Sequence, residues 1–229
     1  MATSAQTTSK NSRARDEILA TIRASLKASL PFDAAHRRNH SEEESVSTVS
    51  SSARTSTELL DGFRKNLESV GGICHLVASD AESAEIIAET IRSLDAKRIA
   101  ITDSELVRRV VRSDESTELL ENPSPARLFD CDLGVTSAQW AIAETGTLVL
   151  ESERESHRLT SLVPAKHLCI LKASTIRQTL GEILELTKQD LSRTITFITG
   201  ASRTSDIELT LAIGVHGPKE LHVIVIANE

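Results

Sequence analysis

From Thr57 onward, helical stripes alternate with short apolar runs, and this alternation constrains the fold more than any other feature. Apolar residues spaced three and four apart predict helices over 57–70, 84–94, 104–112 and 175–187. Runs rich in Ile, Leu and Val predict strands over 73–77, 98–102, 140–143, 147–150, 167–171, 194–198 and 221–226. Helices that alternate with buried strands indicate an α/β sheet covered by helices on both sides.

One segment fits two periodicities. The apolar residues of 207–213 alternate as in a strand, yet the spacing from Ile207 to Leu211 also fits one face of a helix. The preceding Ser205 and Glu208 match a capping box, in which each side chain satisfies a backbone N–H at a helix start. We therefore predict at least one helical turn here.

The part before Thr57 differs in composition. Residues 1–12 are rich in Ser and Thr, and we expect them to be disordered. Residues 13–30 place Ile18, Leu19, Ile22 and Leu26 on one stripe, which predicts an amphipathic helix. Residues 31–56 contain a Ser-dense tract that buries too little apolar surface to fold, so we interpret them as a flexible linker. Residues 57–229 form the predicted α/β domain.

Charge and aromatic content exclude several classes of partner. The net charge of −7 and the pI near 5.6 provide no attraction to phosphate polymers or anionic lipid. Four Phe, one Trp and no Tyr cannot build a base-stacking platform, so we expect no nucleic acid. No run approaches 18 apolar residues, which argues against a membrane span. Residues 1–11 lack an apolar stretch typical of secretion, so we expect a cytoplasmic protein.

The three cysteines are spread along the chain. Cys74, Cys131 and Cys169 form no C-x-x-C pair, so they offer no local ligand set for zinc or an iron–sulfur cluster. Cys74 and Cys169 lie inside apolar runs, which is typical of buried, reduced thiols. We therefore predict neither a metal site nor a cofactor in this chain.

Three segments place small hydroxyl residues, a glycine and a charged group beside an apolar strand, which suggests a shared cleft. Segment 199–206 predicts a site that binds an anion or carboxylate. Free N–H groups at a helix start attract negative charge, and a guanidinium adds a full positive charge beside them. Its residues are Thr199, Gly200, Ser202, Arg203, Thr204 and Asp206. The alternative is helix capping alone, with Arg203 paired to Asp206 or Glu208.

The other two segments carry candidate catalytic groups. Glu144 ends an apolar run, where a carboxylate can act as base, nucleophile or hydrogen-bond acceptor, and Thr145 and Gly146 after it are candidate ligand-binding residues of the same cleft. His216, between two glycines, can transfer protons near neutral pH. A solvated hairpin at Glu144 and a turn held by His216 remain open as alternatives. Dinucleotide, P-loop and hydrolase-elbow motifs are absent.

The same segments carry a family resemblance. Segments 134–147, 198–208 and 214–218, together with the opening 18–23, resemble the signatures of the LUD family, the LutC/YkgG-type lactate utilisation proteins. This resemblance implies a Rossmann-like α/β/α sandwich similar to the sugar-phosphate isomerase and CoA-transferase (NagB/RpiA/CoA transferase-like) fold. It also implies a role in oxidising L-lactate to pyruvate, beside partner proteins that carry the iron–sulfur clusters.

Three functions follow from the sequence. The first is a subunit of a lactate-oxidising system that binds a small carboxylate or organises the complex. The second is a stand-alone enzyme on a phosphosugar or acyl-CoA, with Glu144 as nucleophile by analogy with the transferases. The third is an assembly module that docks through the 13–30 helix. Whether the chain is itself an enzyme, and whether it forms a homo-oligomer, stays open.

Overall fold

The computed structural model describes residues 17–24, 54–112, 116–152, 158–188, 192, 194–205, 211–214 and 216–227. The chain divides into two units, Met1–Ser52 and Ala53–Glu229. In the first unit, residues 17–24 are helical, and Thr21 Oγ1 donates to the carbonyl of Glu17 at 2.9 Å. The remainder of the predicted 13–30 helix, the predicted disordered 1–12 segment and linker residues 31–53 lie outside the described residues.

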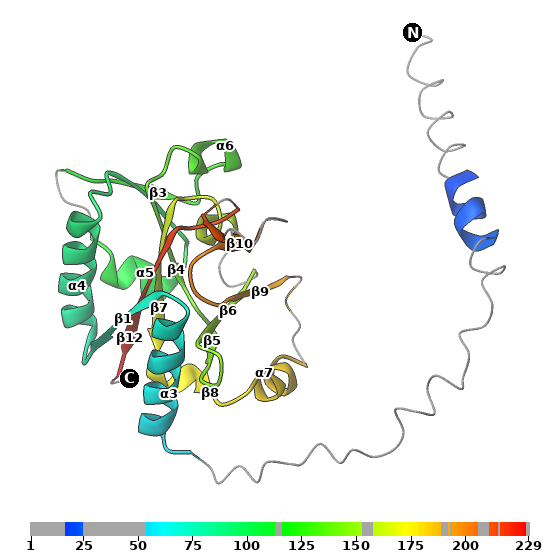
Figure 1. Cartoon of the computed structure of the whole chain (residues 1–229). Helices are drawn as coiled ribbons and strands as arrows, with labels where there is room; N and C mark the ends of the chain where they lie inside the picture. Colours follow the sequence, from blue (N-terminus) through cyan, green and yellow to red (C-terminus); the bar gives the residue numbers. More distant parts are fainter. Residues whose placement is uncertain are drawn as a thin grey trace. The chain divides into compact units, whose positions relative to one another are not determined.

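The second unit is built on a six-stranded parallel sheet with the order β1-β12-β7-β4-β2-β3 (Figure 1). Strands that pair in parallel need long connections, and here helices and a second sheet provide them. The central strands are buried on both faces, which explains their nearly continuous apolar sequences. The strands span Gly72–Val77 (β1), Glu220–Ile226 (β12), Lys166–Lys172 (β7), Leu133–Ser137 (β4), Arg98–Ile101 (β2) and Glu118–Glu121 (β3).

Helices α4 (Asp80–Ser93) and α5 (Glu105–Val110) pack on one face of this sheet (Figure 1). Helix α4 begins at Ser79, whose Oγ accepts the N–H of Glu82 at 3.3 Å. Its apolar stripe places Ile87 and Ile91 in one cluster with Ile99 of β2 and Val107 of α5. Each such buried side chain contributes about 1.5–3 kcal/mol of transfer free energy.

Helix α3 (Ser56–Ser69) and a second, four-stranded sheet cover the opposite face (Figure 1). A capping box between Thr55 and Glu58 starts α3, and its Phe63 and Leu67 are completely buried against the central sheet. The second sheet has the order β8-β5-β6-β9 and packs beside helix α7 (Leu180–Thr187). Its strands are Ile176–Arg177 (β8), Trp140–Ile142 (β5), Thr147–Glu151 (β6) and Ile195–Ile198 (β9).

The predicted fold class is confirmed, since the protein is mixed α/β with a central parallel sheet flanked by helices. The likeness to the sugar-phosphate isomerase and CoA-transferase fold stays a prediction. The predicted strands do not all join one sheet: those over 140–143, 147–150 and 194–198 form the second one. Strands β3 and β4, helix α6 (Pro125–Leu128) and the 3₁₀ turns Arg158–Ser161 and Ala173–Thr175 were not predicted.

Two helix predictions are wrong in part. The predicted 175–187 helix starts only at Leu180, because Thr179 caps it and Ile176 belongs to strand β8. Within 207–213, residues Leu211–Ile213 are strand β11, which pairs antiparallel with β10 (Arg203–Ser205). The helical turn predicted from the capping-box pattern falls on residues 206–210, which lie outside the described residues.

Several titratable groups are buried in the domain. His167 is completely buried, its Nε2 lies 2.8 Å from Thr136 Oγ1, and burial lowers its pKa to about 3. The rings of His75 and His222 stack with their centroids 5.8 Å apart, and burial lowers both pKa values. None of the three cysteines forms a disulfide, and burial raises the pKa of Cys74 to about 11. The Cys74 thiol is therefore protonated at neutral pH.

The described part of the chain holds neither a metal-type cluster nor a membrane-spanning helix. No group of three or more His, Cys, Asp or Glu residues there has the arrangement of a metal site. None of the described helices combines the length and the apolar character needed to cross a membrane.

Candidate functional site

Two of the predicted segments meet at the C-terminal end of α3. Gly146, with a φ of +66°, lies so close to α3 that a Cβ there would be 2.2 Å from the Leu67 nitrogen. Gly200, with a φ of +76°, approaches the last turn in the same way, and a Cβ there would be 2.4 Å from the Val70 oxygen. Only glycine fits at either position, for reasons of both conformation and space.

Polar contacts complete this arrangement. A chain of hydroxyl groups links Thr145 Oγ1 to Thr147 Oγ1 and Thr147 Oγ1 to Thr199 Oγ1, each at 2.7 Å. The guanidinium of Arg203 donates to the carbonyl of Val70 at 2.9 Å. A cation at this place stabilises the unpaired carbonyls that end a helix. We call this region the α3 junction: residues 143–147 and 199–203 packed against the end of α3.

The remaining predicted residues make other contacts. Glu144 is exposed, and its Oε1 accepts the N–H of Leu180, the first residue of α7, at 3.3 Å. His216 lines a second pocket of about 370 Å³ together with Phe129 and Lys219. The backbone of Ser202 holds the loop beside this pocket, donating to Pro218 at 2.8 Å and accepting from Gly214 at 2.9 Å.

The helix start that was expected after Thr204 falls on residues 206–210, which lie outside the described residues, and Arg203–Ser205 before it is strand β10. Thr204 pairs with Ala212 through the backbone, and Asp206 lies outside the described residues. The structure therefore brings Thr145, Gly146, Thr199, Gly200 and Arg203 together around a helix end. Their roles in binding, and those of Glu144 and His216 in catalysis, stay predictions.

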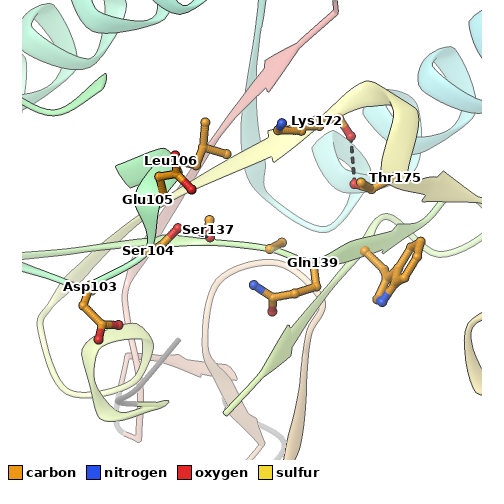
Figure 2. A pocket seen from close by; sticks show the side chains of 10 residues that line it. Asp103, Ser104, Glu105, Leu106, Ser137, Gln139, Lys172 and Thr175 are labelled. Atoms are coloured by element: carbon orange, nitrogen blue, oxygen red, sulfur yellow. Dashed lines mark hydrogen bonds between the residues drawn. The ribbon is translucent and has the colours of Figure 1, made fainter. Parts of the chain in front are cut away.

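A larger pocket, of about 640 Å³, opens beyond the carboxyl ends of β2, β4 and β7 (Figure 2). Its residues come from three connections of the central sheet: the turn between β2 and α5, the turn between β4 and β5, and the end of β7. They are Asp103, Ser104, Glu105, Leu106, Ser137, Ala138, Gln139, Trp140, Lys172 and Thr175. None of the residues predicted as functional is among them.

The topology of the sheet explains why a pocket forms here. Strands β2 and β4 are neighbours. The chain leaves β2 towards α5 on one face of the sheet, whereas it leaves β4 towards β5 on the opposite face. Connections that diverge from adjacent parallel strands leave a crevice between them, and α/β proteins bind ligands in such crevices. We call this cavity the switch-point pocket.

The side chains of the switch-point pocket are polar and well positioned. Ser104 Oγ lies 2.8 Å from Ser137 Oγ, so these hydroxyls join the two diverging connections. Glu151 fixes two side chains of the pocket wall. Its Oε1 accepts from Trp140 Nε1 at 3.0 Å, and its N–H donates to Gln139 Oε1 at 2.7 Å. Figure 2 shows Asp103 and Glu105 on the β2 side and Lys172 at the end of β7.

The sequence carries a signal for this pocket outside its motifs. Asp103 and Ser104 directly follow the predicted strand 98–102, and Lys172 directly follows the predicted strand 167–171. Polar residues just past the ends of parallel strands meet at one edge of the sheet, which is where α/β proteins bind ligands.

Residues 60–226 match the LUD domain, so the chain belongs to the LUD domain family. It is similar to a lactate utilization protein C of Deinococcus radiodurans, with 40% identity over 45% of this chain and 50% of that protein. A lactate utilization protein C of Bacillus licheniformis is 34% identical over 44% of this chain and 45% of that protein. The chain thus matches about half the length of these curated relatives.

A solved structure supports the fold independently. The crystal structure of a DUF162 family protein from Deinococcus radiodurans superposes with a TM-score of 0.61 at 25% identity. The superposition covers 76% of this chain and 99% of that one.

Proposed function

We propose that this chain is a LutC-type component of an L-lactate utilisation system. The observation that carries the proposal is family membership over residues 60–226, together with relatives named lactate utilization protein C. In this role the chain binds a small carboxylate, while the iron–sulfur clusters used in oxidising L-lactate to pyruvate are held by partner proteins.

The positions of the cysteines support the second part of this proposal. Cys74 lies on β1, Cys169 on β7, and Cys131 just before β4, so the three thiols are not grouped. Cys131 and Cys169 are buried, and Cys74 is half-buried with a raised pKa. Cluster ligands are exposed to the metal as thiolates, which these side chains are poorly suited to provide.

A genetic experiment tests the role in the system. Deleting the gene in the organism that encodes it, with neighbouring genes intact, should abolish growth on L-lactate and leave growth on glucose unchanged. Expression of the full chain from a plasmid should restore growth on L-lactate. Normal growth of the deletion strain on L-lactate would refute the proposal.

Two cationic side chains are candidates for the carboxylate contact. Arg203 is exposed and already donates to the α3 carbonyl of Val70. Lys172 is half-buried and lines the switch-point pocket. Calorimetry with the purified chain and L-lactate should show saturable binding. The variants Lys172→Met and Arg203→Met, described below, distinguish the two candidates.

A further inference from the structure

We infer that the free edge of strand β1 is a dimerisation surface, at which β1 of a second copy of this chain pairs antiparallel about a two-fold axis and extends the central sheet. The inference concerns assembly and does not depend on the proposed function. Three features carry it: the backbone groups of this edge, its exposed apolar side chains, and the charges of α3 beside it.

The backbone of β1 is available for pairing on one side. The strand pairs with β12, and no described strand lies on its other side (Figure 1). The N–H of Ala227 donates to the carbonyl of Val77 at 2.8 Å, so the backbone groups of Val77 face β12. Because these groups alternate in direction along a strand, those of Cys74 and Leu76 point away from β12. A two-fold axis brings the same groups of a second copy opposite them.

The side chains of β1 also favour pairing. Ile73 is 46% exposed and Leu76 is 48% exposed, although both are large and apolar. The strand contains no Asp, Glu, Lys, Arg or Pro, the residues with which proteins usually keep a sheet edge free. With six residues, β1 is also the longest of the edge strands that the structure describes. A second copy covers these two side chains and satisfies the outward backbone groups.

The opposite edge of the same sheet is protected. Strand β3 carries an exposed carboxylate at each end, Glu118 and Glu121. Glu118 Oε1 lies 3.4 Å from Arg127 Nη2, and Glu121 Oε1 lies 3.0 Å from Arg108 Nε. Charged side chains along an edge oppose the approach of another strand. The central sheet thus has one protected edge and one edge that is open to pairing.

The charges of α3 favour a second copy of this chain over an unrelated strand. Only Val70 and Gly71 separate α3 from β1, so the helix runs antiparallel to the strand. Arg64 and Glu68 lie one turn apart on α3 and close to Cys74. Burial is the main cause that raises the pKa of Cys74, and the charges of Arg64 and Glu68 act on that pKa in opposite directions.

A two-fold axis near Cys74 makes this pair of charges self-complementary. It reverses the order of the charges in the second copy, so that each guanidinium lies on the side of the other copy's carboxylate. Within one copy, Arg64 Nε bonds Glu68 Oε1 at 2.9 Å, and the two side chains are 53% and 46% exposed. Both groups can therefore contact the second copy without giving up this bond, because a guanidinium has five N–H donors.

The mass of the purified full chain in solution tests the surface. By analytical ultracentrifugation at about 100 μM we expect twice the 24.9 kDa of one chain, because a contact of modest area is typical of weaker complexes. Leu76→Lys should weaken the dimer about tenfold or more, since an edge lysine opposes strand pairing. A wild-type chain that stays monomeric at this concentration would overturn the inference.

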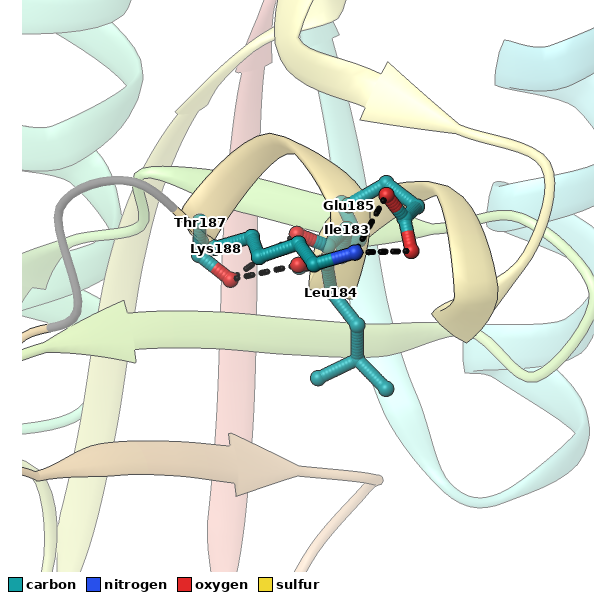
Figure 3. A network of polar contacts seen from close by, with 5 residues as sticks. All are labelled: Ile183, Leu184, Glu185, Thr187 and Lys188. Carbon is teal, nitrogen blue, oxygen red and sulfur yellow. Dashed lines mark hydrogen bonds and ion pairs between the residues drawn. The ribbon is translucent and has the colours of Figure 1, made fainter.

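Leu184→Lys is the matched control. Leu184 on α7 is 49% exposed, close to the value for Leu76, and Figure 3 shows its side chain extending away from the helix. This variant should dimerise as the wild-type chain does. Equal weakening by the two lysine substitutions would show that the β1 edge does not hold the copies together.

Charge variants test the two-fold arrangement. The Arg64→Glu chain presents two carboxylates at this place, and the Glu68→Arg chain presents two guanidinium groups. Each chain alone should dimerise about fivefold more weakly than wild type, whereas an equimolar mixture should form a heterodimer at nearly wild-type affinity. Urea denaturation of each variant separates this effect from a loss of folding. A mixture that dimerises no better than either chain alone contradicts the inference.

Amide hydrogen exchange locates the contact. The N–H groups of Cys74 and Leu76 should exchange about tenfold more slowly in the dimer than in dilute, monomeric samples, because the second copy supplies their hydrogen-bond acceptors. In the Leu76→Lys chain this protection should be lost at the same protein concentration. A dimer that leaves these two amides unprotected is held together elsewhere, and the inference would then be wrong.

Discussion

The α3 junction and the switch-point pocket use similar residue types for different purposes. At the junction, glycines with positive φ and a chain of threonine hydroxyls allow two loops to pack directly on a helix end. At the pocket, serines, an aspartate and a lysine surround an open cavity of about 640 Å³. Small hydroxyl residues beside an apolar strand therefore occur both in a packed loop and at an open pocket, and only the junction combines them with glycines that approach a helix closely.

This comparison divides the residues by their expected effect. Substitutions at the α3 junction should lower the free energy of unfolding and leave intrinsic ligand affinity unchanged. Substitutions at the pocket should do the reverse. The following predictions test this division, beginning with the largest effect.

Gly146→Ala should be the most destabilising of these changes. The new Cβ meets the Leu67 nitrogen and the backbone at Gly146 has a φ of +66°, so both strain and overpacking oppose folding. We expect a loss of about 2–5 kcal/mol, measured by urea denaturation. Gly181→Ala in α7 is the control, because its nearest contact is 3.7 Å and its φ is not positive; its stability should stay level or rise. A Gly146→Ala chain as stable as wild type would show that packing at the α3 junction does not require glycine at this position.

His167 supplies a second test of the packed interior, through pH. In the folded chain burial lowers its pKa from 6.5 to about 3. The unfolded chain binds a proton at this ring below pH 6.5, so between pH 6.5 and 3 the unfolded state holds more protons. Stability present above pH 6.5 is therefore lost as the pH falls, by about 2 kcal/mol at pH 5.

His167→Gln removes this titration and keeps a polar group beside Thr136. Urea denaturation at pH 7 and pH 5 should show a smaller loss on acidification than in wild type. Some loss should persist, since burial also lowers the pKa values of His75 and His222. An unchanged difference between the two pH values would mean that His167 is not neutral and buried in solution.

The fold was more predictable from the sequence than the site, for a physical reason. Helix and strand periodicities are local, and they located α3, α4 and β12 to within a few residues. Which sheet a strand joins depends on partners far along the chain, and so β6 could not be assigned. The contact of Arg203 with Val70 spans 133 positions, which no local motif encodes. Asp103 and Lys172 were accessible to prediction, because both follow buried parallel strands.

Arg203→Met tests the α3 junction more gently. The variant retains an unbranched apolar side chain but loses the hydrogen bond to the Val70 carbonyl. Because Arg203 is exposed, we expect a loss of about 1 kcal/mol, seen as a small decrease in the thermal midpoint. L-lactate affinity should equal that of wild type. A large decrease in affinity with unchanged stability would instead identify the α3 junction as the carboxylate site.

Lys172→Met should have the smallest effect on stability, within about 0.5 kcal/mol by urea denaturation, although it is the change expected to impair binding most. Lys172 lies half-buried at the end of β7, where the strand leaves the core and the pocket begins. Its removal leaves the buried part of β7 unchanged. If Lys172→Met lowers stability as much as Arg203→Met, the lysine is a structural ion-pair partner. Lys172 would then stabilise the fold as Arg203 does, and the pocket would not differ from the α3 junction in this respect.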